Sequence, residues 1–384
     1  MKKNMRRGWK CMRAILIDDE QHALTFLERQ LHKHSQIEVI AKYCYFDIKI
    51  NKDILNEINI VFLDIDMPNI NGLELAEQLL EINPDLFIVF VTAFNEYAVQ
   101  AFELNALDYI LKPVDQKRLK KTLNRISERR QNNAISEPIA EDHLQINMFQ
   151  QLSFQTSNAT KLIKWRTKKA QEIFAYLLHN VNQTVRKSHL AELFWPNFQQ
   201  ERAYSQLYTA IYHIRKVLTK YKAYLTIKNI HEGYMLAIDH TTIDVVDWES
   251  ALNSAPTLTM NTIDEYEQIM KLYTGAYLAV HEYFWAEAER YRLELLWLDA
   301  ARAMADLYWQ HNDVDKSIQW YENICQSIPE DEKANFMLMK IYDTLGYGLL
   351  VNHQYQQFQH TLQDLNIEMD SEIQAWYESR NALN

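Results

Sequence analysis

Short apolar runs alternate with helix-like stretches along the first third of the chain. The strand-like runs are rich in β-branched and aromatic residues and lie at 14–17, 37–43, 60–63, 87–91 and 109–111. Amphipathic, helix-like segments lie near 21–32, 47–56, 72–81, 96–104 and 115–130. Alternation of this kind over about 120 residues predicts a doubly wound parallel sheet with helices on both faces. We therefore expect an α/β domain over residues 12–130.

Polar residues follow four of these strand-like runs. Asp18 and Asp19 follow the first run, Asp64 the third, Thr92 the fourth and Lys112 the fifth. Because open α/β sheets bind their ligands at the carboxyl ends of the strands, these side chains are expected to form one site.

The residue types at this site indicate phosphoryl chemistry. Clustered carboxylates repel one another unless a cation lies among them, and Mg²⁺ prefers oxygen ligands. Asp19 and Asp64 are expected to bind Mg²⁺ directly, with Asp18 nearby. Asp64 would then attack phosphorus and form an acyl phosphate. The metal and Lys112 would stabilise the transferring oxygens, and Thr92 would donate a hydrogen bond to the phosphoryl group.

This segment resembles the flavodoxin-like receiver domain of two-component response regulators, with Asp64, Met67 and Pro68 in its D-x-x-M-P stretch. The resemblance implies a histidine kinase partner and no enzymatic activity beyond the domain's own phosphoryl transfer and dephosphorylation. It assigns these roles: phosphoacceptor Asp64, metal pair Asp18 and Asp19, backbone carbonyl ligand Asp66, switch hydroxyl Thr92, aromatic switch Tyr109, and Lys112 before a cis-type proline.

A phosphatase of the haloacid dehalogenase type is the specific rival for this segment. Asp64 and Asp66 form the D-x-D pattern of that class. The pattern belongs on the first strand, however, with Thr or Val four residues after the nucleophile. Here it follows the third strand, and Pro68 occupies that later position.

The middle of the chain predicts a winged helix over 143–240, after a polar linker at 131–142. Strand-like stretches at 143–155 and 161–165 precede three helices, and two short strands end the segment. Ser188 is expected to cap the second helix. The three helices are expected at 168–180, 188–194 and 201–221.

Charge favours DNA as the partner of this segment. Residues 161–230 carry thirteen Lys/Arg and three Asp/Glu in a chain whose net charge is −11. Such a basic island points to an anionic partner; a basic face that binds the acidic domain of the same chain is the alternative. The segment resembles the OmpR-type winged helix, especially its form in SARP-type activators, which implies binding to promoter DNA. The expected DNA-facing residues are Tyr208, Tyr212, His213, Arg215, Lys216, Lys228 and Asn229.

Residues 243–384 predict an acidic, all-helical domain. They carry eight Lys/Arg and twenty-four Asp/Glu. An internal repeat with an offset of 34 aligns Tyr308 with Tyr342 and Ile324 with Phe358, and this is the tetratricopeptide period. The region resembles the bacterial transcriptional activation domain that follows the SARP winged helix. That resemblance implies RNA polymerase or another regulator as a partner.

Together these features predict a DNA-binding response regulator that forms a homodimer when phosphorylated. A receiver-controlled tetratricopeptide scaffold that binds protein or RNA is the alternative. Three widely spaced cysteines favour a reducing cytoplasm, and no apolar run approaches the roughly 18 residues of a membrane span.

Overall fold

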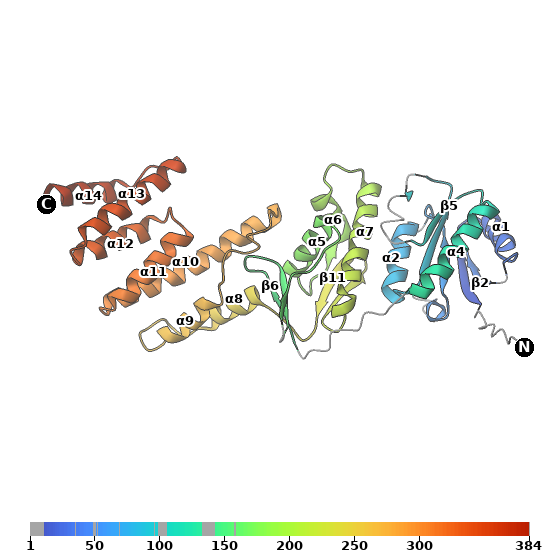
Figure 1. Ribbon diagram of the computed structural model, residues 1–384, viewed down its shortest axis with the longest axis horizontal. Helices are drawn as coiled ribbons and strands as arrows, with labels where there is room; N and C mark the ends of the chain where they lie inside the picture. The colour runs from blue at the N-terminus through green and yellow to red at the C-terminus, as the bar shows by residue number, and fades with distance from the viewer. Residues whose placement is uncertain are drawn as a thin grey trace, which may run out of the picture. The chain divides into compact units, whose positions relative to one another are not determined.

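The computed structural model divides into two compact units (Figure 1). The first comprises the chain up to His143 together with Ile163–Thr241, and the second comprises Leu144–Leu162 together with Thr242–Asn384. The structure describes residues 11–34, 36–48, 51, 53–68, 70–95, 97–98, 106–132, 143–156 and 159–383.

The N-terminal part of the first unit is the predicted α/β receiver. Its five-stranded parallel sheet has the order β2-β1-β3-β4-β5. Ile15 and Ile17 of β1 lie in one hydrophobic cluster and Ala14 and Leu16 in another, as a strand buried on both faces requires. The strands are β1 (Met12–Ile17), β2 (Ile37–Tyr43), β3 (Ile60–Leu63), β4 (Phe87–Thr92) and β5 (Asp108–Leu111).

Helices α1 (Gln21–Leu31), α2 (Gly72–Ile82) and α4 (Gln116–Asn132) match three of the predicted helices. The helix predicted over 47–56 is wrong for the described residues, because only a 3₁₀ turn at Ile54–Asn56 forms there. Isoleucine and asparagine are frequent in this stretch, and both disfavour a helix. Most of the helix predicted at 96–104 and most of the linker lie outside the described residues.

The winged helix forms the rest of the first unit. Thr167 caps its first helix by accepting a hydrogen bond from the backbone N–H of Ala170 at 3.1 Å. The second helix begins one residue earlier than predicted, so Ser188 lies inside it and the N-cap is Arg186. The elements are α5 (Lys168–His179), β9 (Val185–Arg186), α6 (Lys187–Phe194), α7 (Gln200–Leu218), β10 (Leu225–Ile230) and β11 (Gly233–Ile238), with sheet order β10-β11-β9.

The second unit begins with a sheet of order β12-β6-β7-β8. The sequence grouped residues 143–155 with the winged helix, whereas the structure packs Leu144–Leu162 with the helical unit. Asp244 joins these strands to the helices, since its carboxylate accepts hydrogen bonds from the backbone N–H groups of Met148 at 2.7 Å and Phe149 at 3.1 Å. The strands are β6 (Leu144–Asn147), β7 (Ser153–Thr156), β8 (Ala159–Lys161) and β12 (Thr241–Ile243).

Helical pairs make up most of the second unit, as the 34-residue repeat predicted. Helix α10 packs on α11 and α12 packs on α13, and the aligned residues Tyr308, Tyr342, Ile324 and Phe358 are all buried. Among the described residues, no helix has the length and hydropathy to span a membrane. The helices are α8 (Asp244–Ser254), α9 (Ile263–Lys271), α10 (Glu287–Gln310), α11 (Val314–Ser327), α12 (Glu332–Thr344), α13 (Gly348–Asp364) and α14 (Ser371–Leu383).

Candidate functional site

The predicted strand-end residues do meet at one edge of the receiver sheet. One carboxylate oxygen from each of Asp18, Asp19 and Asp64 lies within 4.8 Å of the others; we call these three residues the acidic cluster. Asp18 and Asp64 are buried and Asp19 is exposed. Three converging carboxylates, one of them facing solvent, suit a hard divalent cation that keeps some of its water.

Lys112 supplies a positive charge at this cluster. Its Nζ lies 2.8 Å from Asp18 Oδ2 and 2.7 Å from Asp64 Oδ2. Burial disfavours its charged form, but the hydrogen bonds to the two carboxylates outweigh burial and raise its pKa. Burial also raises the pKa of Asp18, against the hydrogen bond from Lys112. The Lys112–Pro113 peptide bond is cis, as expected.

Thr92 and Tyr109 converge on the segment that follows β4. Thr92 is fully buried, and its hydroxyl oxygen accepts a hydrogen bond from the backbone N–H of Phe94 at 3.4 Å. The Tyr109 hydroxyl donates a hydrogen bond to the backbone carbonyl oxygen of Phe94. Tyr109 is turned inward, with 7% of its surface exposed. Thr92 and Tyr109 therefore hold the same residue, Phe94, so a change at Thr92 acts directly on the residue that Tyr109 contacts.

Helix α2 begins directly against the backbone of Asp64. The N–H of Gly72 donates to the carbonyl of Ile65 at 2.7 Å. A Cβ at Gly72 would lie 2.0 Å from the carbonyl oxygen of Asp64, so only glycine fits here. The side chain of Asp66 is exposed, and its carbonyl as a metal ligand remains a prediction.

The structure separates the residues predicted to face DNA. Lys216 and Lys228 are exposed, and Tyr212 is half-buried. The exposed position expected for His213 is wrong: the side chain is buried, and burial together with the nearby Arg166 and Lys216 lowers its pKa to about 4. The remaining three, Tyr208, Arg215 and Asn229, contact the receiver.

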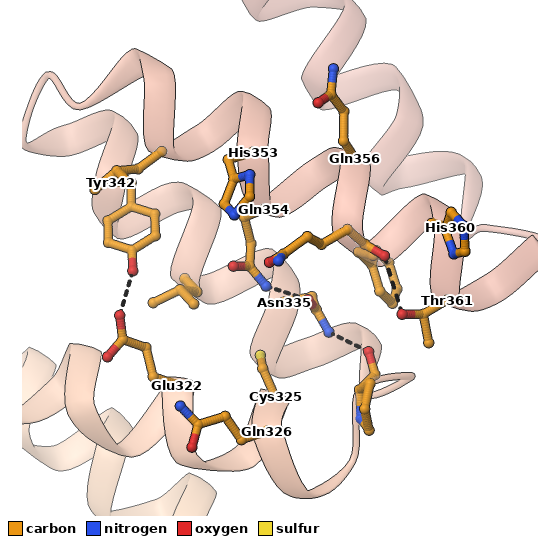
Figure 2. A pocket seen from close by; sticks show the side chains of 15 residues that line it. Glu322, Cys325, Gln326, Asn335, Tyr342, His353, Gln354, Gln356, His360 and Thr361 are labelled. Atoms are coloured by element: carbon orange, nitrogen blue, oxygen red, sulfur yellow. Dashed lines mark hydrogen bonds between the residues drawn. The ribbon is translucent and has the colours of Figure 1, made fainter.

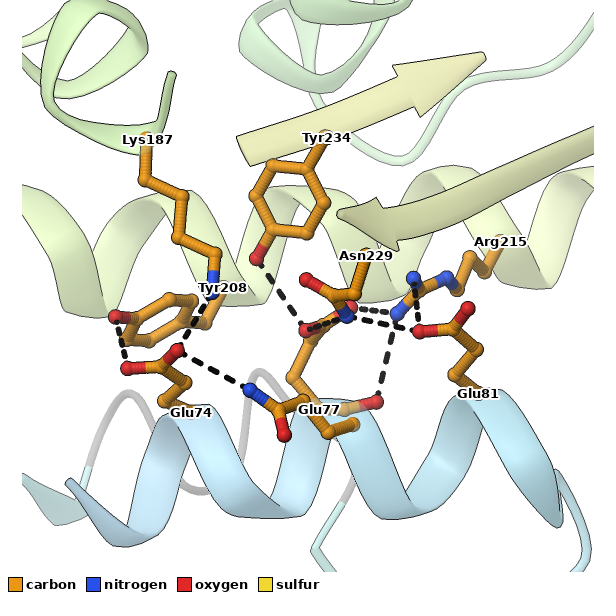
Figure 3. Close-up of polar contacts among 9 residues, drawn as sticks. Glu74, Glu77, Glu81, Lys187, Tyr208, Arg215, Asn229 and Tyr234 are labelled. Carbon is orange, nitrogen blue, oxygen red and sulfur yellow. Dashed lines mark hydrogen bonds and ion pairs between the residues drawn. The ribbon is translucent and has the colours of Figure 1, made fainter. Parts of the chain in front are cut away.

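Three glutamates of α2 make these contacts, and Figure 3 shows them pointing toward the winged helix. We call Glu74, Glu77 and Glu81 the acidic ridge. Glu74 accepts hydrogen bonds from Lys187 Nζ at 2.6 Å and from the Tyr208 hydroxyl at 2.9 Å.

The rest of the ridge pairs with one arginine and the wing. Glu81 Oε2 lies 2.7 Å from Arg215 Nη2 and 2.8 Å from Asn229 Nδ2. Glu77 is 1% exposed; it pairs with Arg215 and accepts from Tyr234 at 3.3 Å. Burial raises the pKa of Glu81. Sequence reasoning missed this contact, although the glutamate spacing i, i+3, i+7 places all three on one helix face.

The second unit contains a cavity of about 870 Å³ lined by residues of α11, α12 and α13 (Figure 2). Its walls carry several carboxamides; Gln354 Nε2 donates to Asn335 Oδ1 at 2.6 Å. The Tyr342 hydroxyl donates to Glu322 Oε1 at 2.8 Å at one side. Gln354, Asn335, Tyr342 and Glu322 therefore have partners within the domain.

Two family models match the chain. The model for the response regulator receiver domain matches residues 14–124, and the model for the bacterial transcriptional activator domain matches residues 249–379. The first match contains every residue of the acidic cluster together with Thr92, Tyr109 and Lys112.

Individual relatives agree with these models. An uncharacterized response regulatory protein of Yersinia pestis is 48% identical over 119 residues, which are 30% of this chain and 48% of that protein. The transcriptional regulatory protein LytR of Staphylococcus aureus is 31% identical over 174 residues, 45% of this chain and 69% of that protein. The chain spans about half the length of the first curated relatives that it matches.

Among solved structures, the chain is similar to Mycobacterium tuberculosis EmbR in complex with a low affinity phosphopeptide. The two are 18% identical with a TM-score of 0.45, and the match covers 62% of this chain and 64% of EmbR. From the family models and the S. aureus relative, the chain belongs to the response regulators of two-component systems, with a receiver domain followed by a transcriptional activator domain of the SARP type.

Proposed function

We propose that this protein is a transcription regulator that binds promoter DNA under the control of phosphorylation at Asp64. The observation that carries the proposal is the acidic cluster with Lys112 bridging Asp18 and Asp64 at the strand ends. A buried aspartate beside a lysine and two further carboxylates is suited to accept a phosphoryl group.

Asp64 would act as the nucleophile. Its carboxylate oxygen attacks the phosphorus of a phosphohistidine on a histidine kinase, the P–N bond breaks, and the imidazole leaves with its electron pair. Lys112 stabilises the negative charge on the transferring oxygens. Mg²⁺ held by Asp18, Asp19, Asp64 and the Asp66 carbonyl would neutralise further charge when bound.

The phosphoryl group would then reach the switch residues. Thr92 turns its hydroxyl from the Phe94 amide to a phosphoryl oxygen. That turn removes one of the hydrogen bonds that hold the segment around Phe94, which also accepts from Tyr109. The resulting change on the receiver alters dimerisation and the availability of the winged helix.

DNA is the proposed target of the winged helix, and RNA polymerase or another regulator is the proposed target of the acidic helical domain. Lys216 and Lys228 are exposed for phosphate contact. Arg215, Tyr208 and Asn229 have the donors for phosphate or base edges once they leave the receiver. The phosphatase rival is weaker, because Asp64 follows the central strand β3 and not the first strand.

Labelling with acetyl phosphate tests the receiver chemistry. Asp64→Asn removes the nucleophile and should abolish labelling, as should chelation of Mg²⁺. Asp66→Asn is the matched control, because the exposed Asp66 side chain is not part of the proposed chemistry and its carbonyl is retained. Labelling of Asp64→Asn at the wild-type level would overturn the assignment.

Salt-dependent binding tests the DNA target. The full-length protein should select a promoter over random DNA, and binding should weaken with salt with a log–log slope of about −0.9 per phosphate neutralised. Equal affinity for all duplexes, or no DNA binding at any salt concentration, would favour the scaffold that binds protein or RNA.

A further inference from the structure

The acidic ridge covers a specific face of the winged helix. Tyr208 and Arg215 lie on one side of α7, and Asn229 lies on the adjoining strand β10. Tyr208 is 4% exposed, and it belongs to the same hydrophobic cluster as Leu73 and Ala76 of α2. Three of the seven residues that the sequence placed toward DNA lie on this face, so the receiver covers part of the surface that DNA would need.

The contact uses the chemistry of a phosphate contact. Lysine, arginine, tyrosine and asparagine donate to phosphate oxygens with the same groups that here donate to carboxylate oxygens. Lys187 and Tyr208 both donate to Glu74, and Arg215 pairs with both Glu77 and Glu81. The carboxylates therefore occupy the donors that the DNA backbone would need.

Burial shows that the contact is specific rather than a chance meeting of surface charges. Glu77 is 1% exposed and Lys187 is 4% exposed. Burying a charge is costly unless it is paired and hydrogen-bonded, and each of these two groups has its partner on the other domain. A loose surface ion pair would leave both groups in water.

We propose that the acidic ridge of α2 is a docking surface for the DNA-reading face of the winged helix, and that it competes with DNA for Lys187, Tyr208, Arg215 and Asn229. The proposal rests on the function proposed above, since it requires that this face bind DNA. It places the output surface of the receiver on α2, the helix that begins against the Asp64 backbone.

The test compares charge reversal on the ridge with the same reversal elsewhere on the receiver. The ridge variant is Glu74→Lys/Glu81→Lys in the full-length, unphosphorylated chain. The control is Glu38→Lys/Glu57→Lys, which changes the net charge equally at two exposed receiver positions outside α2, one of which, Glu57, pairs with Arg13 of the receiver itself. If the ridge variant does not fold, Glu74→Gln/Glu81→Gln replaces it.

Two readouts are measured. Acetylation of Lys187 by an amine-reactive ester, followed by mass spectrometry, reports whether the contact is formed. Fluorescence anisotropy with a random-sequence DNA duplex reports DNA affinity at one fixed salt concentration. Losing a buried, hydrogen-bonded charge pair should accelerate Lys187 labelling and raise DNA affinity by about tenfold or more relative to the control.

The outcomes separate this inference from the proposed function. Fast Lys187 labelling in the wild type, or a ridge variant that frees Lys187 but binds DNA like the control, would overturn the inference and leave DNA binding intact. A ridge variant that frees Lys187 and still binds no DNA would overturn the proposed DNA function, and the inference with it.

Discussion

The acidic cluster and the acidic ridge are two sets of three carboxylates on the same receiver, and their charges are balanced differently. In the cluster, Lys112 is the cation that bridges two buried aspartates, and the exposed Asp19 faces solvent. Along the ridge, Lys187 and Arg215 of the winged helix offset two of the three glutamate charges, and Tyr208, Tyr234 and Asn229 add hydrogen bonds.

This difference separates a site of chemistry from a site of docking. The cluster keeps the larger excess of negative charge, so it suits a divalent cation and, in the proposed function, then accepts a phosphoryl group. The winged helix already donates hydrogen bonds to the ridge carboxylates. Another anion can therefore take the place of these carboxylates on the winged helix, whereas a metal ion would find few free carboxylate oxygens to bind. In the proposed function, the larger excess of negative charge therefore marks the input of this receiver, and the better compensated charge marks its output.

Removal of Lys112 tests the input side and should have the largest effect. Lys112→Met leaves Asp18 and Asp64 without their shared cation, so Asp64 should lose at least roughly a hundredfold in its rate of labelling by acetyl phosphate. Mg²⁺ affinity, followed by fluorescence or calorimetry, should not fall, because a positive charge has left the site. A variant that labels at the wild-type rate would show that Lys112 has only a structural role.

Gly72→Val should disturb both the acidic cluster and the acidic ridge, because Gly72 lies against the backbone of Asp64 and begins α2. Its Cβ would lie 2.0 Å from the Asp64 carbonyl oxygen, and the backbone must move to relieve the clash. We expect the receiver to lose about 3 kcal/mol of its free energy of unfolding, measured by hydrogen exchange of the strands. Lys187 labelling should accelerate at the same time.

Gly348→Ala is the control for this prediction. Its nearest added contact, at 3.0 Å, is the flexible end of Arg380, so its effect should stay within about 0.5 kcal/mol. Equal effects of the two substitutions would contradict the close packing assigned to Gly72.

The pH dependence of stability that comes from His213 tests whether the winged helix or the receiver buries this side chain. Its effect on stability should be smaller than that of Gly72→Val. With a pKa of about 4 when folded and 6.5 ordinarily, His213 binds a proton in the unfolded chain at a higher pH than in the folded chain. Stability should therefore fall as the pH drops from about 6.5 toward 4. The loss between pH 8 and pH 5 should be about 2 kcal/mol.

His213→Gln should remove that part of the pH dependence, as measured by hydrogen exchange of α7 at the two pH values. The ridge variant should keep it if the winged helix itself buries the imidazole, beside its own Arg166 and Lys216. A ridge variant that loses the pH dependence would mean that the receiver buries His213.

The sequence predicted the acidic cluster well because one rule governs it. Residues at the carboxyl ends of neighbouring parallel strands must lie close together, so the strand pattern alone placed Asp18, Asp64 and Lys112 in one site. The helix predicted at 47–56 was wrong because the prediction gave the amphipathic spacing of its apolar residues more weight than their low helix propensity. The exposed position predicted for His213 was wrong because its ring lies beside the apolar stripe of α7. At such a position, the spacing of residues along the sequence does not show whether a side chain is buried.

The acidic ridge could not be predicted, since it depends on a contact between domains. The spacing of Glu74, Glu77 and Glu81 on α2 is equally typical of a solvated helix face. What marks the ridge is the 1% exposure of Glu77, and exposure of this kind follows only from knowing which surface covers the helix.

The contact between Gly72 and the Asp64 carbonyl limits how this protein can be re-engineered. Because Asp64, the proposed phosphoacceptor, and α2, the proposed docking helix, touch through their backbones, a foreign receiver brings its own α2 whenever it brings its own aspartate. A chimera that joins another sensor's receiver to this winged helix would therefore need glutamates matching positions 74, 77 and 81 grafted onto that helix. Without them, we expect the hybrid to accept its phosphoryl group normally but to lack the proposed restraint on its winged helix.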